Sequence, residues 1–290
     1  MSSVGAAPAV ELAAPVRRRA RRRPATPVLI GAAIVATLGL AALLAPLIAP
    51  SAPNEVDFTA PLAGPSLAHP MGTDDTGRDV LSRSLYGLRI DLAIVLLITY
   101  VPLPIGVLLG AVAGSFGGKI DAVIARLADV MLAFPFFVLV IAIIAIVGPG
   151  LTGVLIGVPL AAWALYARLA RSEMLVLREQ PFMLATTALG YSRTRAILRH
   201  AVPNLMRTAL IYSTLDMVVN LLLLSSLSYL GLGMQPPGAE LGTIIAGGQP
   251  YLLSAWWIAT LPGLILVVFG VGVGLIGDGL SDGRLRSGAA

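Results

Sequence analysis

The sequence predicts an all-α integral membrane protein with six transmembrane helices, and three observations lead to this prediction. The 290 residues are 57% hydrophobic and 12% charged, with a mean hydropathy of +0.88, whereas a soluble domain carries about 25% charged residues. Uncharged runs recur along the chain, each with roughly the 20 residues that a membrane-spanning helix needs. The basic residues gather in segments that all lie on one side of the membrane in this topology.

An arginine-rich N-terminus, residues 1–27, precedes the first predicted span, residues 28–50. Its arginines hold this end of the chain in the cytosol by the positive-inside rule. The small residues at 49–52 leave a cleaved signal peptide as the alternative. The apolar run is long for a signal peptide and its prolines spoil the cleavage pattern, so we expect an uncleaved anchor.

Five further spans are predicted downstream of an outer segment over 51–89. Pro102 and Pro104 should kink the first of the five. Gly106, Gly110 and Gly114 give it a face for close helix packing. The predicted domain covers residues 90–278. Its five spans are 91–115, two within 130–167 that are separated by a turn at 148–150, 208–230 and 255–277. A cytosolic loop at 116–129 and an outer segment at 231–254 connect spans, and a cytosolic tail at 279–290 follows the domain.

The distribution of basic residues supports the six-span topology. Of the 20 Lys and Arg, only Arg78, Arg83 and Arg89 fall outside, and all the others fall inside. The prediction therefore places both termini in the cytosol. A topology with one span fewer would put the arginines of residues 178–204 outside.

The polar, cation-rich segment 178–204 lies between two apolar runs, and it is predicted to form two short helices hinged at Gly190. We call it the elbow. Gly190 suits the left-handed conformation that ends a helix, Ser192 suits the N-cap of the next helix, and Pro203 should stop that helix. Its apolar faces need a cover, for which we expect a cytosolic motor subunit; anionic lipid headgroups are the alternative. The other polar candidates for this contact are Arg193, Arg195, Arg199 and His200.

The outer segment 51–89 is predicted to contain an amphipathic helix. Thr76 and Asp79 have the spacing of a capping box, and Asp79 and Arg83 have the i,i+4 spacing of a helical ion pair. The residues that share one face of this helix are Val80, Leu81, Ser84, Leu85 and Leu88.

Asp216 is the one ionisable residue well inside a predicted span. An intramembrane carboxylate is by default a functional hypothesis, for example as a proton relay. Because the prediction puts Asp216 near the cytosolic end of its span and near Arg207, snorkelling or pairing at the interface is the simpler interpretation, and we favour it.

Four motifs in this order resemble the C-type permease subunit of dipeptide and oligopeptide ABC importers. In the elbow, Ala185, Gly190 and Pro203 match the spacing of the family's cytosolic EAA loop, with Leu184 at the position of the family's Glu. The other three matches are residues 69–83 with HPLGTDxxGRDxLSR, 227–237 with LSFLGLGxxPP, and 277–282 with GDGLRD.

The resemblance implies a MetI-like transmembrane domain of a type I ABC importer in the cytoplasmic membrane. It implies that the chain forms half of a peptide pathway with a second, B-type permease, and that two cytosolic ATP-binding subunits dock on the elbow. An extracytoplasmic binding protein would dock on the outer segments. A proton-coupled secondary transporter and a passive channel are the competing interpretations. The candidate contacts for the binding protein are Asp74, Asp75, Arg78, Asp79, Arg83 and Gln235.

No enzymatic site, metal site or nucleic-acid site is expected in this chain. A glycine-rich stretch ends at Lys119, but Ala113 and Ile120 stand where a Walker A motif needs Gly and Ser or Thr. The only two histidines, His69 and His200, are predicted on opposite sides of the membrane, and the chain has no Cys. ATP and Mg²⁺ would therefore belong to the partner subunits, and this chain would carry no cofactor.

Overall fold

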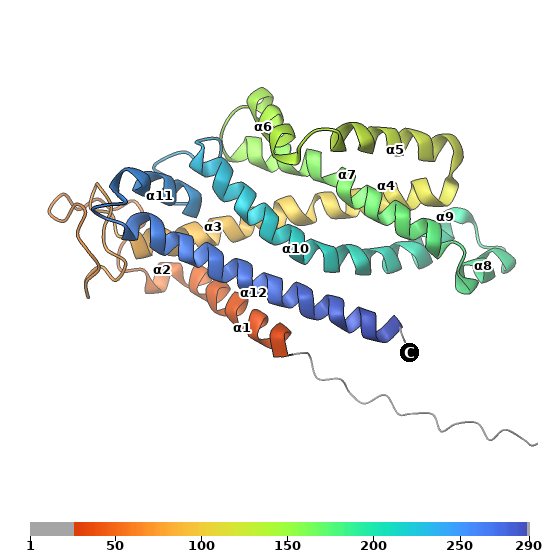
Figure 1. Cartoon of the computed structure of the whole chain (residues 1–290), viewed down its shortest axis with the longest axis horizontal. Coiled ribbons are helices and arrows are strands. Elements are labelled where there is room, and N and C mark those ends of the chain that lie inside the picture. Colours follow the sequence, from red (N-terminus) through yellow and green to blue (C-terminus); the bar gives the residue numbers. More distant parts are fainter. Residues whose placement is uncertain (1–25, 289–290) are drawn as a thin grey trace, which may run out of the picture.

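The computed structural model describes residues 26–288, and these form an elongated bundle of helices (Figure 1). Residues 1–25 of the predicted arginine-rich terminus lie outside the described residues. The helices are α1 (Thr26–Leu43), α2 (Ala45–Ile48), α3 (Val80–Tyr100), α4 (Pro102–Phe116), α5 (Gly118–Leu132), α6 (Phe136–Val147), α7 (Leu151–Leu177), α8 (Pro181–Ala188), α9 (Arg193–Ala196), a π-helical turn (Ile197–Ala201), α10 (Val202–Tyr229), α11 (Leu241–Gly248), a 3-10 turn (Gln249–Tyr251) and α12 (Trp257–Gly288).

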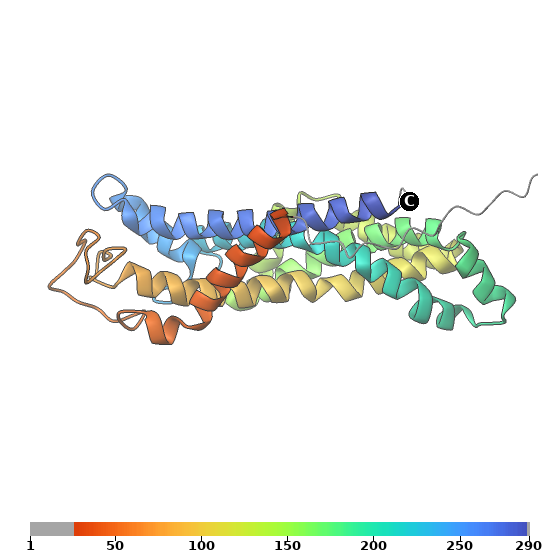
Figure 2. The same cartoon turned by 90° about the horizontal axis from the view of Figure 1, so that it is seen from below.

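Five helices in the described part are long and apolar enough to cross a membrane: α1, α3 with α4, α7, α10 with the turns before it, and α12. The pair α5 and α6 passes the same test only as one span, which is bent by 89°. The described part thus has five candidate spans, or six when the bent pair is counted as one. The elbow lies at one end of the bundle, and residues 51–79 and α11 lie at the other (Figures 1 and 2).

The predicted cytosolic loop at 116–129 is wrong, because most of it is helix α5. The polar residues of this segment are spaced so that two carboxylates reach α7. Arg171 forms a two-fold ion pair with Asp121, and Arg168 Nη2 donates to Asp129 Oδ1 at 2.7 Å. The next helix, α6, has only 12 residues, or about 18 Å, and therefore needs α5 to cross a hydrocarbon core of about 30 Å.

The glycine face predicted on the second span packs against α7. A Cβ on Gly110 would lie 2.8 Å from the Cβ of Ala170, and one on Gly114 would lie 2.8 Å from the Cβ of Met174. Only glycine permits this approach of the two backbones. The helix is interrupted for one residue at Val101, where α3 ends and α4 begins with Pro102, but Val101 keeps helical backbone angles and the two helices form one span.

Pro203 does not stop the second elbow helix, contrary to the prediction. The chain widens into a π-helical turn over Ile197–Ala201, where the N–H of Val202 donates to the carbonyl of Ile197. The wider turn accommodates a residue that has no N–H and whose ring would clash with the preceding turn. Asn204 Nδ2 donates to the carbonyl of His200 at 2.7 Å. Arg193 and Tyr229 therefore belong to one continuous span.

Three apolar clusters hold the bundle together. The central cluster joins α1, α3, α6, α7, α10, α11 and α12. A second cluster at the elbow end joins α4, α7, the elbow and the start of α10. A third, around Val80, Ile244 and Trp257, joins the outer segment to α11 and α12. Helix α12 continues through the predicted tail as far as Gly288.

Candidate functional site

The elbow has the predicted hinge. Gly190 has φ +75°, in the left-handed region that favours glycine, and it lies between α8 and α9. Ser192 is the N-cap of α9, as predicted, and its side chain accepts a hydrogen bond from the backbone N–H of Arg195 at 3.4 Å. The N–H of Tyr191 donates to the carbonyl of Thr186 at 3.0 Å, which closes the turn.

The inner side of the elbow is fixed to the bundle. Met183, Ile197 and Ala201 are buried in the cluster that includes α4 and α7. Arg178 Nη1 donates to the carbonyl of Gly114 at 3.4 Å. The elbow thus contacts α4 through Arg178, which also caps the end of α7, and it continues into α10 through the π-helical turn.

Stacked side chains organise the polar groups of the elbow. The guanidinium of Arg195 lies 4.5 Å from the ring centre of Tyr191, and the ring of His200 stacks on the same tyrosine with centres 5.8 Å apart. The guanidinium of Arg193 lies 5.9 Å from the ring centre of Phe116, at the end of α4. His200 Nε2 is buried without a hydrogen-bond partner in the described part of the chain.

The side of the elbow that faces away from the bundle carries an exposed apolar surface. This end of the bundle is rich in arginine. Ala185 and Arg199 are exposed on it, as are the predicted hinge and cap residues. The large apolar side chains of this surface are Phe182 (43% exposed), Leu184 (57%), Leu189 (72%) and Leu198 (56%). Four large apolar side chains so close to charged groups indicate a protein partner.

One face of α10 is also uncovered, and sequence reasoning missed it. Its exposed residues alternate in steps of three and four residues, the spacing of a face that packs on another helix. This face can be recognised only in the structure, where the residues between them are buried or partly buried. We call this face the α10 stripe; it consists of Tyr212, Leu215, Val219, Leu222, Ser226 and Tyr229. Two of its residues are tyrosines and one is a serine, whereas the exposed large side chains of α12 between 264 and 271 are all Leu or Val, as expected for a face toward lipid.

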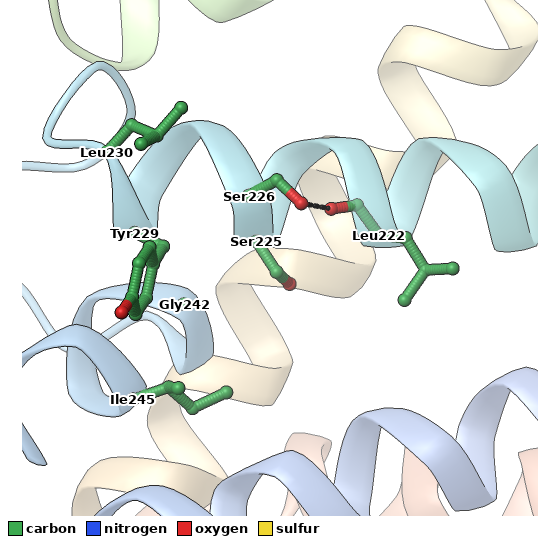
Figure 3. A pocket seen from close by; sticks show the side chains of 7 residues that line it. All are labelled: Leu222, Ser225, Ser226, Tyr229, Leu230, Gly242 and Ile245. Atoms are coloured by element: carbon green, nitrogen blue, oxygen red, sulfur yellow. Dashed lines mark hydrogen bonds between the residues drawn. The ribbon is translucent and has the colours of Figure 1, made fainter. Parts of the chain in front are cut away.

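A pocket of about 340 Å³ opens at the outer end of the α10 stripe, between α10 and α11 (Figure 3). Ser226 Oγ donates to the carbonyl of Leu222 at 2.7 Å, while Ser225 Oγ is buried without a partner in the described residues. The pocket lining is Leu222, Ser225, Ser226, Tyr229 and Leu230 from α10, with Gly242 and Ile245 from α11.

Asp216 lies beside the α10 stripe and does not pair with Arg207. Its Oδ2 accepts hydrogen bonds from the hydroxyl of Tyr166 at 2.7 Å and from Asn220 Nδ2 at 3.1 Å. Asn220 Nδ2 also donates to Thr99 Oγ1 at 2.9 Å. The prediction placed Asp216 near a helix end, but the span continues to Arg193, so the carboxylate lies far from both ends of the helix. It is partly buried, among groups from α3, α7 and α10.

The charged residues of the 69–83 motif mostly serve an internal network. Asp74 accepts hydrogen bonds from Thr76 N and Oγ1 and from Arg78 N and Nε, between 2.7 and 3.0 Å. Arg83 donates to Pro53 O at 3.0 Å and lies 3.7 Å from Asp74 Oδ2. Asp74 and Arg83 are at most 5% exposed, so these side chains fold the segment and do not form a free surface.

The helix of this segment begins at a different residue from the one predicted. Asp79 itself is the N-cap of α3, and its Oδ1 accepts from Ser82 N at 2.7 Å. Its Oδ2 lies 3.0 Å from His69 Nδ1, so Asp79 pairs with histidine and not with Arg83. The capping-box and i,i+4 predictions are therefore wrong, because Thr76 is held in the turn before the helix by Asp74.

Exposed groups remain at the outer end. The side chain of Asp75 is 44% exposed, and Gln235 is exposed although its side chain donates to the carbonyls of Gly231 and Gly233. The hydroxyl and N–H of Thr59 donate to Asp57 Oδ1, and these bonds lower the pKa of Asp57. Trp257 Nε1 donates to the carbonyl of Thr73 at 3.1 Å and fastens the segment to α12.

The described residues contain no group of three or more His, Cys, Asp or Glu placed to hold a metal ion. The arrangement instead offers an exposed apolar elbow at one end, an uncovered helix face along the bundle and a folded segment at the other end. These are features of a membrane component that works with partners.

Several known proteins are similar to this chain. The "Probable D,D-dipeptide transport system permease protein DdpC" of Escherichia coli (strain K12) is 36% identical over 87% of this chain and 84% of its own length. The "Dipeptide transport system permease protein DppC" of Alkalihalophilus pseudofirmus is 37% identical over 88% of this chain and 84% of its own. The "Nickel transport system permease protein NikC" of Escherichia coli is 34% identical over 86% of this chain and 90% of its own.

The fold and the family agree with these relatives. A chain of the MetNI methionine ABC transporter in an inward-facing conformation has a TM-score of 0.50 to this structure, with 18% identity, over 68% of this chain and 93% of that one. Residues 106–285 match the family described as "Binding-protein-dependent transport system inner membrane component". This chain belongs to that family, and it is a multi-pass membrane permease subunit of an ABC importer with the MetI-like fold.

Proposed function

We propose that this chain forms one half of the translocation pathway of an ATP-driven peptide importer in the cytoplasmic membrane, with both termini in the cytosol. The observation that carries the proposal is the elbow, whose inner side is buried in the bundle and whose outer side exposes apolar residues among arginines. Because the chain has no phosphate-binding loop, the chemistry of ATP and Mg²⁺ would occur in two cytosolic partner subunits.

The elbow would transmit the movement of the ATPases. Phe182, Leu184 and Leu189 on and just after α8 would sit in an apolar groove of an ATPase. When the ATPases close on ATP, the elbow would be pushed as one piece, because Gly190 and the Ser192 cap fix its bend. Packed helices switch between discrete arrangements, so α7 and α10 would move between inward- and outward-open states. The arginines at 193, 195 and 199 and His200 would orient the contact.

A second, non-identical permease subunit would face the α10 stripe across the pathway. Tyr212, Leu215 and Val219 are exposed along this face in the isolated chain. The polar residues in the stripe favour protein over lipid as the cover, because intramembrane polar groups such as Asp216 face a bundle interior or a water-filled cavity. The pathway would run between the two permeases along this face.

An extracytoplasmic binding protein would dock at the outer end. The exposed Asp57, Asp75 and Gln235 and the exposed apolar residues Phe58 (83%) and Leu253 (104%) are available for this contact. Asp74, Asp79 and Arg83 would support the docking surface from below, since they are buried in the turn that holds it. Two of the relatives named above carry a dipeptide in their names and one carries nickel, and we propose a peptide as the cargo here.

The proposal is tested by reconstituting the chain with its second permease, ATPases and binding protein in proteoliposomes and measuring uptake of labelled peptide. We expect uptake that requires ATP and the binding protein. Uptake driven by a proton gradient without ATP would favour a secondary transporter, and uptake with no energy source would favour a passive channel.

The elbow contact has its own variant. Replacing Phe182 by Ala should lower the amount of ATPase that co-purifies with the permease by about tenfold, the loss expected when an interface anchor is truncated. The control is Leu253→Ala, because Leu253 is likewise an exposed large apolar residue but lies at the opposite end of the bundle. Equal retention of ATPase by the two variants would contradict docking at the elbow.

A further inference from the structure

The carboxylate of Asp216 has no charged partner in the described part of the chain. Asp216 is 14 residues after Val202 and 13 before Tyr229, or about 20 Å from either end of α10. The groups that face it are the hydroxyl of Tyr166 from α7, and Asn220 from α10, which is bound in turn to Thr99 of α3. A carboxylate at this depth has to be neutralised by a proton or by a cation.

The geometry around Asp216 leaves room for a cation. Both hydrogen bonds to the side chain end on Oδ2, and they fix the carboxylate while Oδ1 receives no hydrogen bond from the described residues. Asp216 is only partly buried, whereas Tyr166 and Asn220 are each 1% exposed. Asp216 directly follows Leu215 of the α10 stripe in the helix, so its exposed part borders the same surface.

Aromatic rings accompany the carboxylate. The ring of Tyr212, one turn before Asp216, meets the ring of Tyr166 edge-on with centres 5.7 Å apart. Tyr212 belongs to the α10 stripe and is 36% exposed, so its ring is accessible from the same side. A carboxylate oxygen beside tyrosine rings is the chemistry that binds an ammonium group, through a charge-assisted hydrogen bond and a cation–π contact.

We propose that Asp216 and Tyr212 form a binding site for the protonated amino group of the peptide cargo, half-way across the membrane. This rests on the proposed function, since it requires that cargo passes along the α10 stripe. The pocket of about 340 Å³ at the other end of the same stripe shows that this face of the chain is not filled by its own side chains. A fixed cation of the second permease would satisfy the same carboxylate, and the experiment separates the two sources.

The test measures protection of a thiol by dipeptides in the assembled transporter. The chain has no Cys, so Val219→Cys introduces its only thiol, on the α10 stripe at a residue that is 55% exposed and one turn from Asp216. With a second permease also free of Cys, the rate of modification by a water-soluble thiol reagent is followed with increasing alanyl-alanine or N-acetyl-alanyl-alanine. We expect alanyl-alanine to protect at about tenfold lower concentration, the factor that one charge-assisted hydrogen bond supplies.

Asp216→Asn, made in the same background, keeps the size and the hydrogen bonds of the side chain but not its charge. The two dipeptides should then protect equally. The Tyr166→Phe variant keeps the charge and should keep the preference for the free amino group, which separates the charge from the fit of the side chains.

Four outcomes would overturn the site. The first is equal protection by both dipeptides in the parent protein, and the second is a preference for alanyl-alanine that survives in Asp216→Asn. The third is no protection by either dipeptide although ATP-driven uptake proceeds. The fourth is loss of the second permease from the Asp216→Asn complex. The last would show that the partner supplies the cation. Absence of ATP-driven uptake in the unmodified transporter would instead refute the proposed function, so the two failures are distinguishable.

Discussion

The sharpest mechanical test of the elbow is the replacement of Gly190 by Val. Gly190 has φ +75°, and a Cβ added there would meet no atom within 4 Å. The cost of the substitution is therefore one of backbone conformation and not of packing. A β-branched residue in the left-handed region costs about 1–2 kcal/mol, which lowers the population of the bent elbow relative to competing conformations by a factor of roughly 5–30.

The assay is the number of ATP molecules hydrolysed for each peptide taken up by the reconstituted transporter. Gly190→Val should raise this number several-fold while the spans insert normally, because the bend that transmits the push is populated less. The matched control is Gly190→Asn, since Asn also adds a side chain but tolerates the left-handed conformation. Normal coupling in the Val variant, or equal loss in the Val and Asn variants, would refute the role of the bend.

Two further substitutions test the packing of the bundle and of its outer segment. Gly110→Ala should destabilise the purified protein by about 1–3 kcal/mol, because the added methyl group overpacks against Ala170. The control is Gly274→Ala, whose added methyl group meets no atom within 4 Å and which should stabilise the protein slightly because Ala is the better helix former. Shifts of the same sign in the two unfolding temperatures would contradict the close packing of α4 on α7. Asp74→Ala should lower the free energy of unfolding by about 3–5 kcal/mol, because it leaves Arg83 buried without its carboxylate. Limited proteolysis should then cut the chain within residues 51–79. Asp75→Ala, at the exposed neighbouring position, should leave this segment resistant to the protease.

The spans were predictable because hydropathy and charge act on long segments. The positions of Gly106, Gly110 and Gly114 also predicted close helix packing, since a repeat of small residues has few other uses in an apolar helix. The hinge at Gly190 and the cap at Ser192 followed from local backbone chemistry, which depends on neighbouring residues alone.

The errors arose where tertiary contacts override the local pattern. Asp121 and Asp129 made 116–129 resemble a loop, but their partners are arginines on α7, about 40–50 residues away. The burial of Asp74 and Arg83 was missed for a similar reason, because charged residues in a loop are exposed only if no internal partner binds them. The α10 stripe was not found, since an exposed and a buried apolar residue are indistinguishable in a sequence.

The helix through Pro203 connects the two proposals. A chain that ended its elbow helix at this proline would join the elbow to α10 by a loop, and a push on the elbow would be lost in that loop. The π-helical turn over Ile197–Ala201 instead joins α9, the second helix of the elbow, to α10 without a loop. Asp216 lies about four turns beyond this turn on the same rod. Under the proposed function, a movement of the elbow therefore also displaces Asp216 relative to Tyr166 on α7, so the same stroke that opens the pathway would alter the site for the amino group of the cargo.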